Sequence, residues 1–103
     1  MVAMDLTVVD NEQRRRFEVI DEAAVAGFMV YRRRSDAVVI THTEVDGAYE
    51  GQGVGSRLVR GGLDQIRAEG LIVVPECPFV RRFLSRHWDD YADIVVGMEP
   101  PSA

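Results

Sequence analysis

Three glycines lie within five residues in the segment Glu50-Gly51-Gln52-Gly53-Val54-Gly55-Ser56. Glycine has no Cβ, so the backbone can turn sharply there and approach a ligand closely. Free N–H groups at the start of a following helix, together with the helix dipole, favour an anion at such a loop. The spacing therefore predicts a diphosphate-binding loop, although a tight turn without a ligand explains three glycines equally well. The residues predicted to bind are Gly51, Gln52, Gly53, Val54, Gly55 and Ser56.

Cys77 is the only cysteine, and it directly precedes Pro78, a residue that suits the first position of a helix. A thiol at that position faces the positive end of the helix dipole, which favours the reactive thiolate. Cys77 is therefore a candidate nucleophile or proton donor. The structural alternative is a buried cysteine that packs as a small apolar residue.

His42 and Glu44 are separated by one residue and so lie on the same face of a strand. A histidine titrates near working pH and can accept the proton of an amine. Glu44 is a second candidate base, or the group that orients His42. The structural alternative for His42 is a partly buried histidine with its hydrogen bonds satisfied. We expect His87 to cap a helix, and we expect no metal site, because the spacing matches no ligand pattern.

Four alternating stretches precede the glycine loop, and their short connections imply antiparallel strands. They span residues 4–11, 16–20, 23–33 and 37–45. Both faces of residues 23–33 are largely apolar, so we expect a central strand that is covered on both sides. On residues 37–45 we expect one face to carry Val38, Ile40, His42 and Glu44.

Beyond the loop, apolar residues recur about every 3.6 positions, which predicts a helix over residues 54–69 that ends at Gly70. The residues on this apolar face are Leu58, Val59, Leu63 and Ile66. We expect a buried strand over residues 71–74, a second helix from Pro78 and an edge strand over residues 94–96. The sum is an α/β (α+β) fold, in which an antiparallel meander is followed by helix, strand, helix and strand on a mixed sheet.

This order of elements resembles the GNAT superfamily of acetyltransferases, whose acetyl-CoA site has a loop of the type Arg/Gln-x-x-Gly-x-Gly/Ala. Gly53 and Gly55 match the two signature glycines, and Glu50 stands where the Arg or Gln is usual. Three further segments resemble the short, single-domain members of the superfamily, and the resemblance covers roughly residues 15–96. They are His42-Thr43-Glu44-Val45, Cys77-Pro78-Phe79-Val80 and His87-Trp88-Asp89-Asp90-Tyr91.

The resemblance implies a minimal GNAT-like fold and an acetyl-CoA-dependent N-acetyltransferase with acetyl-CoA as cosubstrate. Acetyl would pass from acetyl-CoA to an amine of unknown identity, directly or through Cys77. His42 or Glu44 would act as the base, and a strand N–H near Val45 would stabilise the oxyanion. Val45 is therefore the seventh residue predicted to bind the cofactor.

Three departures favour an alternative, a non-catalytic acyl-CoA-binding or protein-interaction module. Glu50 brings a carboxylate close to a pyrophosphate, and Leu84 stands where many members have a tyrosine that acts as the acid. The segment Asp21-Glu22 is only a turn, whereas longer members have helices there that wall off the acceptor.

Size and charge limit the remaining possibilities. The 103 residues suffice for one domain, which we expect to span residues 1–98, with a disordered tail over residues 99–103. A net charge of −5 argues against a nucleic-acid partner held by a positive field. Without a membrane span or a signal peptide, we expect a cytoplasmic protein that is a monomer or a weak homodimer. Its arginine clusters, at residues 14–16, 32–34 and 81–86, are expected to be mainly solvated.

Overall fold

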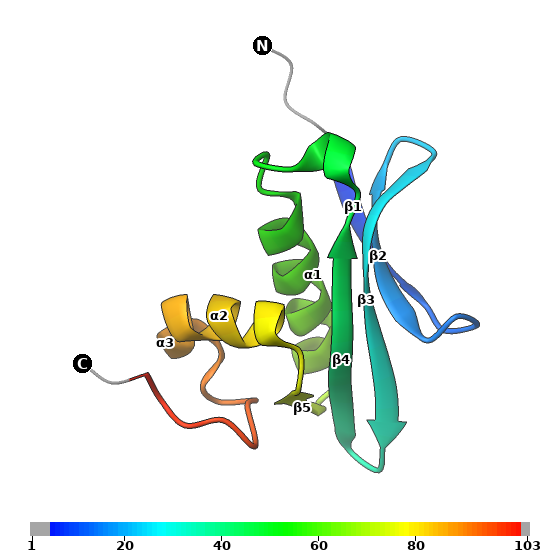
Figure 1. Cartoon of the computed structure of the whole chain (residues 1–103). Coiled ribbons are helices and arrows are strands. Elements are labelled where there is room, and N and C mark those ends of the chain that lie inside the picture. The colour runs from blue at the N-terminus through cyan, green and yellow to red at the C-terminus, as the bar shows by residue number, and fades with distance from the viewer. Residues whose placement is uncertain (1–4, 102–103) are drawn as a thin grey trace.

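A computed structural model describes residues 5–101, which form one sheet with helices on one side (Figure 1). The sheet has the order β1-β2-β3-β4-β5, in which the first four strands are antiparallel and β5 runs parallel to β4. The strands are β1 (Leu6–Asn11), β2 (Arg16–Asp21), β3 (Ala24–Arg34), β4 (Ala37–Val45) and β5 (Ile72–Pro75). The predicted antiparallel meander and mixed sheet are thus confirmed, while Met4 of the first predicted strand lies outside the described residues.

The helices follow the predicted order, with two short additions. The elements are η1 (Gly47–Tyr49), α1 (Val54–Ala68), α2 (Pro78–Arg86) and α3 (Trp88–Tyr91). The long helix α1 ends beside Gly70, whose φ of 74° is the left-handed conformation expected of its C-terminal glycine. All four apolar residues predicted for its inner face are buried. The short helices η1 and α3 were not predicted, because neither is long enough to show a period.

One core lies between the sheet and the helices. Helix α1 contacts all five strands, and α2 packs against α1, β4 and β5. The core cluster runs from Phe17 of β2 to Ile94 near the C-terminus. Met29 and Tyr31 of β3 point into it and are buried. Phe28 and Val30, on the other face of β3, are only half-buried.

The expectation that β3 is covered on both faces is therefore wrong. The guanidinium of Arg16 lies 4.3 Å from the centre of the Phe28 ring and shields part of that face in place of a helix. The second apolar face of a strand can thus be covered by one long arginine side chain, without a helix packed on it.

Two irregularities in the sheet decide which way side chains point. The pairing register shifts between Val19 and Ile20 against β3, and between Val30 and Tyr31 against β4. The second shift leaves Thr41 without a partner, because Ile40 pairs with Tyr31 and His42 with Val30. An extra residue of this kind reverses the alternation of the strand.

The predicted shared face of β4 is wrong for that reason. Val38 and Ile40 point into the core, whereas His42 and Glu44 lie on the helix-free face and are exposed. Thr43 takes the core side instead. Nothing in the sequence of β4 marks the bulge, because threonine is common in regular strands.

The C-terminal edge strand is reduced to a single bridge between Val73 and Val95. The amide of Val73 donates to the carbonyl of Ile94 at 2.8 Å, and Val96 donates back to Val73 at 2.9 Å. The predicted edge strand over residues 94–96 is thus present only as this bridge, because the pairing is too short to form a strand. Of the predicted tail, residues 102–103 lie outside the described residues.

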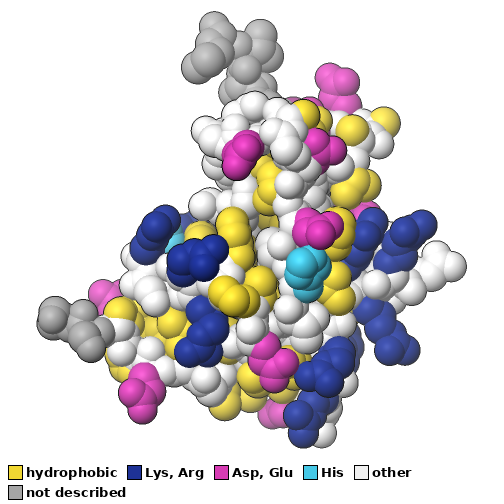
Figure 2. All heavy atoms as spheres, in the orientation of Figure 1, with side chains coloured by type: hydrophobic (Ala, Val, Ile, Leu, Met, Phe, Trp, Pro, Cys, Tyr) yellow, Lys and Arg dark blue, Asp and Glu magenta, His cyan; other side chains and the backbone are white. Residues whose placement is uncertain are grey.

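Basic side chains gather in two regions, one over α2 and one near the hairpin ends of the sheet (Figure 2). Arg81, Arg82 and Arg86 are exposed, as expected of a solvated helix face. Arg16 differs from the rest of its cluster, since its Nε lies 2.7 Å from a carboxylate oxygen of the buried Glu18.

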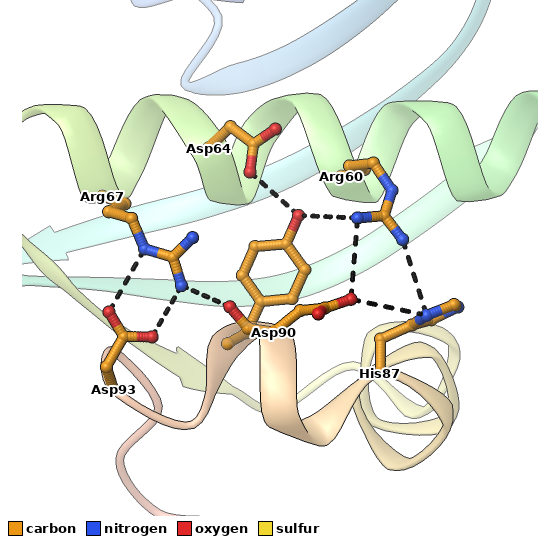
Figure 3. A network of polar contacts seen from close by, with 7 residues as sticks. Arg60, Asp64, Arg67, His87, Asp90 and Asp93 are labelled. Carbon is orange, nitrogen blue, oxygen red and sulfur yellow. Dashed lines mark hydrogen bonds and ion pairs between the residues drawn. The ribbon is translucent and has the colours of Figure 1, made fainter.

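A polar network joins α3 to α1 (Figure 3). The buried Tyr91 hydroxyl donates to Asp64 Oδ1 at 2.9 Å and accepts from Arg60 at 3.4 Å. Arg67 forms an ion pair with Asp93 at 2.6 Å. Burial, and secondarily the hydrogen bond to Asp64, raise the pKa of Tyr91 to about 12. Burial likewise raises the pKa of Tyr31 to about 12.

These phenols predict a loss of stability at alkaline pH. Because their folded pKa values lie above the usual 10.0, their stabilising contribution is complete below pH 10 and is lost as the pH rises toward 12. The sequence contains no lysine, so no lysine titration overlaps this window. We expect the free energy of unfolding from urea titrations to fall over this range. Tyr91→Phe should reduce the slope, and should cost about 1–3 kcal/mol at pH 8 because Asp64 loses its donor. An unchanged slope would contradict the assignment.

Candidate active site

The glycine loop leads directly into α1, as predicted. Gly51 and Gly53 both have a φ of 77°, a conformation that side-chain-bearing residues rarely adopt. The N-cap of α1 is Gly53, which has no side chain that could accept a hydrogen bond from the first amides of the helix. The turn before the loop is fixed by Asp46, whose side chain accepts the Ala48 amide at 2.9 Å.

The start of α1 leaves amides free. Arg57 is the first residue to donate to the N-cap, with its amide 3.1 Å from the carbonyl of Gly53. The preceding amides of Val54, Gly55 and Ser56 have no partner within the helix. The first turn contains no acidic side chain to occupy them. An anion at this helix start would therefore meet three amides that have no partner among residues 5–101, and the positive end of the dipole.

A cavity of about 370 Å³ opens at this helix start. Six of the seven predicted cofactor-binding residues line it; the seventh, Gln52, lines a neighbouring cavity with Arg57 and Arg60. The lining residues are Val45, Gly47, Tyr49, Glu50, Gly51, Gly53, Val54, Gly55, Ser56 and Phe79.

Gly55 has a different role from the one its position in the loop suggested. A Cβ on Gly55 would lie 2.5 Å from the ring of Phe79, so the missing side chain lets α2 pack closely on α1. Gly51 and Gly53, by contrast, have nothing within 4 Å of an added Cβ. Their space opens toward the cavity, which fits the predicted approach of a ligand.

One wall residue of this cavity, Val45, is the last residue of β4, next to an edge of that strand that β5 leaves unpaired. The pairing of β4 with β5 ends at Ile40 and Pro75. Two consecutive amides, those of Glu76 and Cys77, then donate to the carbonyl of Ile40 at 2.9 and 3.1 Å. The chain turns away there into α2, so among residues 5–101 no strand pairs with residues 41–45 of β4 on this side.

Cys77 lies where the two strands separate. It is the N-cap of α2, as expected, and only 4% of its surface is exposed. Its thiol donates to the Thr43 hydroxyl at 3.4 Å. Cys77 does not line the glycine-loop cavity itself, and its predicted catalytic role stays a prediction.

His42 and Glu44 lie on the other side of β4. His42 Nε2 is 3.2 Å from Glu44 Oε1, and both side chains are more than half exposed. A histidine and a carboxylate lie next to each other in the middle of the visible surface in Figure 2. The structure therefore joins His42 with Glu44 but separates both from the thiol of Cys77, because Thr43 between them points the opposite way.

Leu84 and His87 pack against other side chains of the fold, whereas Tyr49 lines the cavity. Leu84, at the position where a tyrosine acid was considered, is fully buried in the core. His87 is the C-cap of α2, and its ring centre lies 4.4 Å from that of Phe83, as a structural residue would. Tyr49 was missed: it lines the cavity and its hydroxyl donates to Asp21 at 2.7 Å. That hydrogen bond raises the pKa of Tyr49. Its only sequence signal was its place just before the loop.

Among residues 5–101, no group of three or more His, Cys, Asp or Glu side chains is arranged to hold a metal ion. Over the same range, no helix has the length and apolar character needed to cross a membrane.

Comparisons with known proteins agree with this geometry. The structure is similar to an NMR structure of a GCN5-like candidate N-acetyltransferase from Staphylococcus aureus, with a TM-score of 0.66 and 26% identity over 96% of this chain and 94% of that one. The ribosomal-protein-S18-alanine N-acetyltransferase of Escherichia coli shares the fold, with a TM-score of 0.53 and 22% identity over 57% of this chain and 40% of that one. No curated protein sequence matches the chain significantly.

The family assignment comes from the sequence itself. Residues 16–94 match the family model described as GCN5-related N-acetyl-transferase. The match covers most of the chain, from the start of β2 to Ile94. The chain therefore belongs to the GCN5-related N-acetyltransferase (GNAT) family and is an acetyltransferase of that fold.

Proposed function

We propose that the protein transfers an acetyl group from acetyl-CoA to a primary amine. The observation that carries this proposal is the cavity at the start of α1, where three free amides meet the unpaired edge of β4. A diphosphate at the amides would leave the rest of the cofactor to run along this edge toward Ile40. The acetyl thioester would then reach the region between Val45 and Cys77.

The alternating direction of amides along β4 supports the Val45 N–H as the donor to the oxyanion. The amide of Asp46 donates to the carbonyl of Ala26 in β3 at 2.8 Å. Neighbouring amides of a strand point in opposite directions, so the amide of Val45 faces the unpaired edge. An N–H there would stabilise the negative charge that develops on the carbonyl oxygen during attack.

The proposed reaction is direct. The neutral amine nitrogen attacks the carbonyl carbon, the carbon–sulfur bond breaks, and CoA leaves as a thiolate. His42, oriented by Glu44, accepts the proton that the amine loses. Cys77 donates a proton toward the departing thiolate and is itself reprotonated from solvent. We favour this acid role over a covalent route because the thiol is buried and already donates to Thr43.

The alternative is a module that binds acyl-CoA without catalysis. The buried Leu84 at the expected acid position and Glu50 in the wall of the cavity favour it. Binding without turnover by the wild-type protein, with a broad set of amines, would decide for this alternative.

We further propose that the protein acts in the cytoplasm as a single domain. A single acetyl-CoA-binding domain over residues 1–98 agrees with one continuous core cluster. A free, buried cysteine suits a reducing compartment such as the cytoplasm. A monomer or weak homodimer stays our expectation, and gel filtration at several concentrations tests it.

The loop predicts the first experiment. Gly53→Asp places a carboxylate among the amides of α1 and should weaken binding of both CoA and acetyl-CoA at least tenfold in isothermal titration. Gly70→Asp is the matched control, because Gly70 has nearly the same φ but lies at the other end of the same helix. It should bind both ligands like the wild type. Equal affinities in the two variants would contradict a cofactor site at residues 50–56.

The thiol gives a second prediction. Cys77→Ala should lower kcat by about 10²-fold, as for the loss of a general acid, with acetyl-CoA affinity unchanged. Intact mass after incubation with acetyl-CoA should show no stable acetyl-enzyme. An adduct that neutral hydroxylamine removes would be a thioester, and Cys77 is the only cysteine in the sequence. Such an adduct, absent from Cys77→Ala, would establish the covalent route instead.

The proposed base, His42, gives a third prediction. His42→Ala should lower kcat about 10²-fold or more while CoA still binds. His87→Ala is the matched control, since it removes the chain's other histidine, which lies outside both the loop cavity and the unpaired edge. Comparable turnover by His42→Ala and the wild type would exclude His42 as the base.

A further inference from the structure

The helix-free face of the sheet contains a second cavity, of about 420 Å³, where β3 begins and β4 ends. Its walls come from these two strands, from Arg16 of β2 and from Asp46, which directly follows β4. They are Arg16, Val25, Ala26, Gly27, Phe28, Glu44, Val45 and Asp46. No residue of this cavity except Val45 lines the glycine-loop cavity.

Val45 connects the two spaces. It lines both cavities, so they are neighbours on either side of the end of β4. Gly27, its partner across the sheet, lets the strands approach closely, because an added Cβ would lie 2.8 Å from the carbonyl oxygen of Glu44. A molecule in the second cavity therefore lies one strand away from a thioester held along the unpaired edge.

The charge of this cavity is negative. Arg16 contributes a positive charge, but a carboxylate oxygen of Glu18 lies 2.7 Å from its Nε and neutralises that charge. The guanidinium also stacks on Phe28, with its central carbon 4.3 Å from the ring centre. Glu44 and Asp46 contribute two carboxylates. Within residues 5–101 neither of them forms an ion pair with an arginine: Glu44 meets only His42, and Asp46 accepts the Ala48 amide.

We propose that this cavity binds the acceptor, and that the acceptor is a primary amine with a second cationic group. This inference rests on the proposed acetyl transfer and specifies its substrate class. The second ammonium group lies against Asp46 and Glu44, while the other amine reaches the thioester as the neutral base. That amine nitrogen forms the bond to the acetyl carbon, the carbon–sulfur bond breaks, and the proton passes to His42.

Three matched amines test the charge requirement with the full chain and acetyl-CoA. They are 1,5-diaminopentane, pentylamine and 5-aminopentanoate, which have the same five-carbon spacer and end in a cation, a neutral methyl and an anion. We expect KM to be lowest for the diamine, by at least tenfold relative to pentylamine, and highest for the amino acid. A KM for pentylamine equal to or below that of the diamine would overturn the proposal.

Asp46→Asn tests the residue assignment. Asparagine retains an oxygen that can accept the Ala48 amide and so preserves the turn. We expect a KM for the diamine that rises about threefold to tenfold, a KM for pentylamine that stays constant, and an unchanged kcat. Glu12→Gln, the same type of change at an exposed carboxylate in the β1–β2 turn, is the control and should leave all three values as they are. An Asp46→Asn variant that retains the full preference would overturn the assignment.

A binding measurement separates this inference from the proposed function. In ¹⁵N NMR titrations without cofactor, 1,5-diaminopentane should shift the amides of Gly27, Phe28 and Val45 saturably, and less so in Asp46→Asn. CoA, titrated separately, reports on residues 50–56. Diamine shifts without CoA shifts would support the second cavity and defeat acetyl transfer. CoA shifts without saturable diamine shifts would defeat the second cavity alone.

Discussion

The carbonyl oxygen of Ile40 accepts two consecutive amides, those of Glu76 and Cys77, and the site depends on this arrangement. Up to Ile40 the strands β4 and β5 pair as ordinary parallel neighbours. Beyond it one oxygen satisfies the last two donors of the departing chain, and Pro78, which has no N–H to offer, starts α2. The remainder of β4 therefore has a free edge, and the start of α1 opens onto the same space. The glycine-loop cavity and the free strand edge adjoin each other at Val45 because the pairing stops there.

The bulge at Thr41 decides on which side of that edge the polar side chains of β4 lie. A regular strand would have aligned His42 and Glu44 with the core residues Val38 and Ile40. The extra residue turns the histidine–carboxylate pair toward the helix-free face and directs Thr43 toward the thiol of Cys77. Groups suited to proton acceptance and proton donation thus flank the same short segment from opposite sides. Such an arrangement agrees with an acceptor that approaches from one face and a leaving group on the other.

The short turn between β2 and β3 leaves one face of the sheet without helices. This small domain stabilises that face differently, with Arg16 stacked on Phe28 and paired to the buried Glu18. A neutralised arginine covers apolar surface and leaves the nearby carboxylates of Glu44 and Asp46 without an arginine partner within residues 5–101. The lack of helices on this face therefore exposes it to solvent and leaves it with a negative charge.

The sequence by itself determined what depends on local spacing. Gly51 and Gly53 predicted the loop, the apolar period predicted α1, and Cys77-Pro78 predicted the start of α2, because turns, helix periods and caps are properties of a few consecutive residues. Family membership was accessible for a related reason, since it rests on several short motifs in a fixed order. Only the tertiary structure decided the face of His42 and Glu44, the packing role of Gly55 against Phe79 and the second cavity. Each of these depends on how residues far apart in the chain pair, and a one-residue shift in register reverses every side chain beyond it.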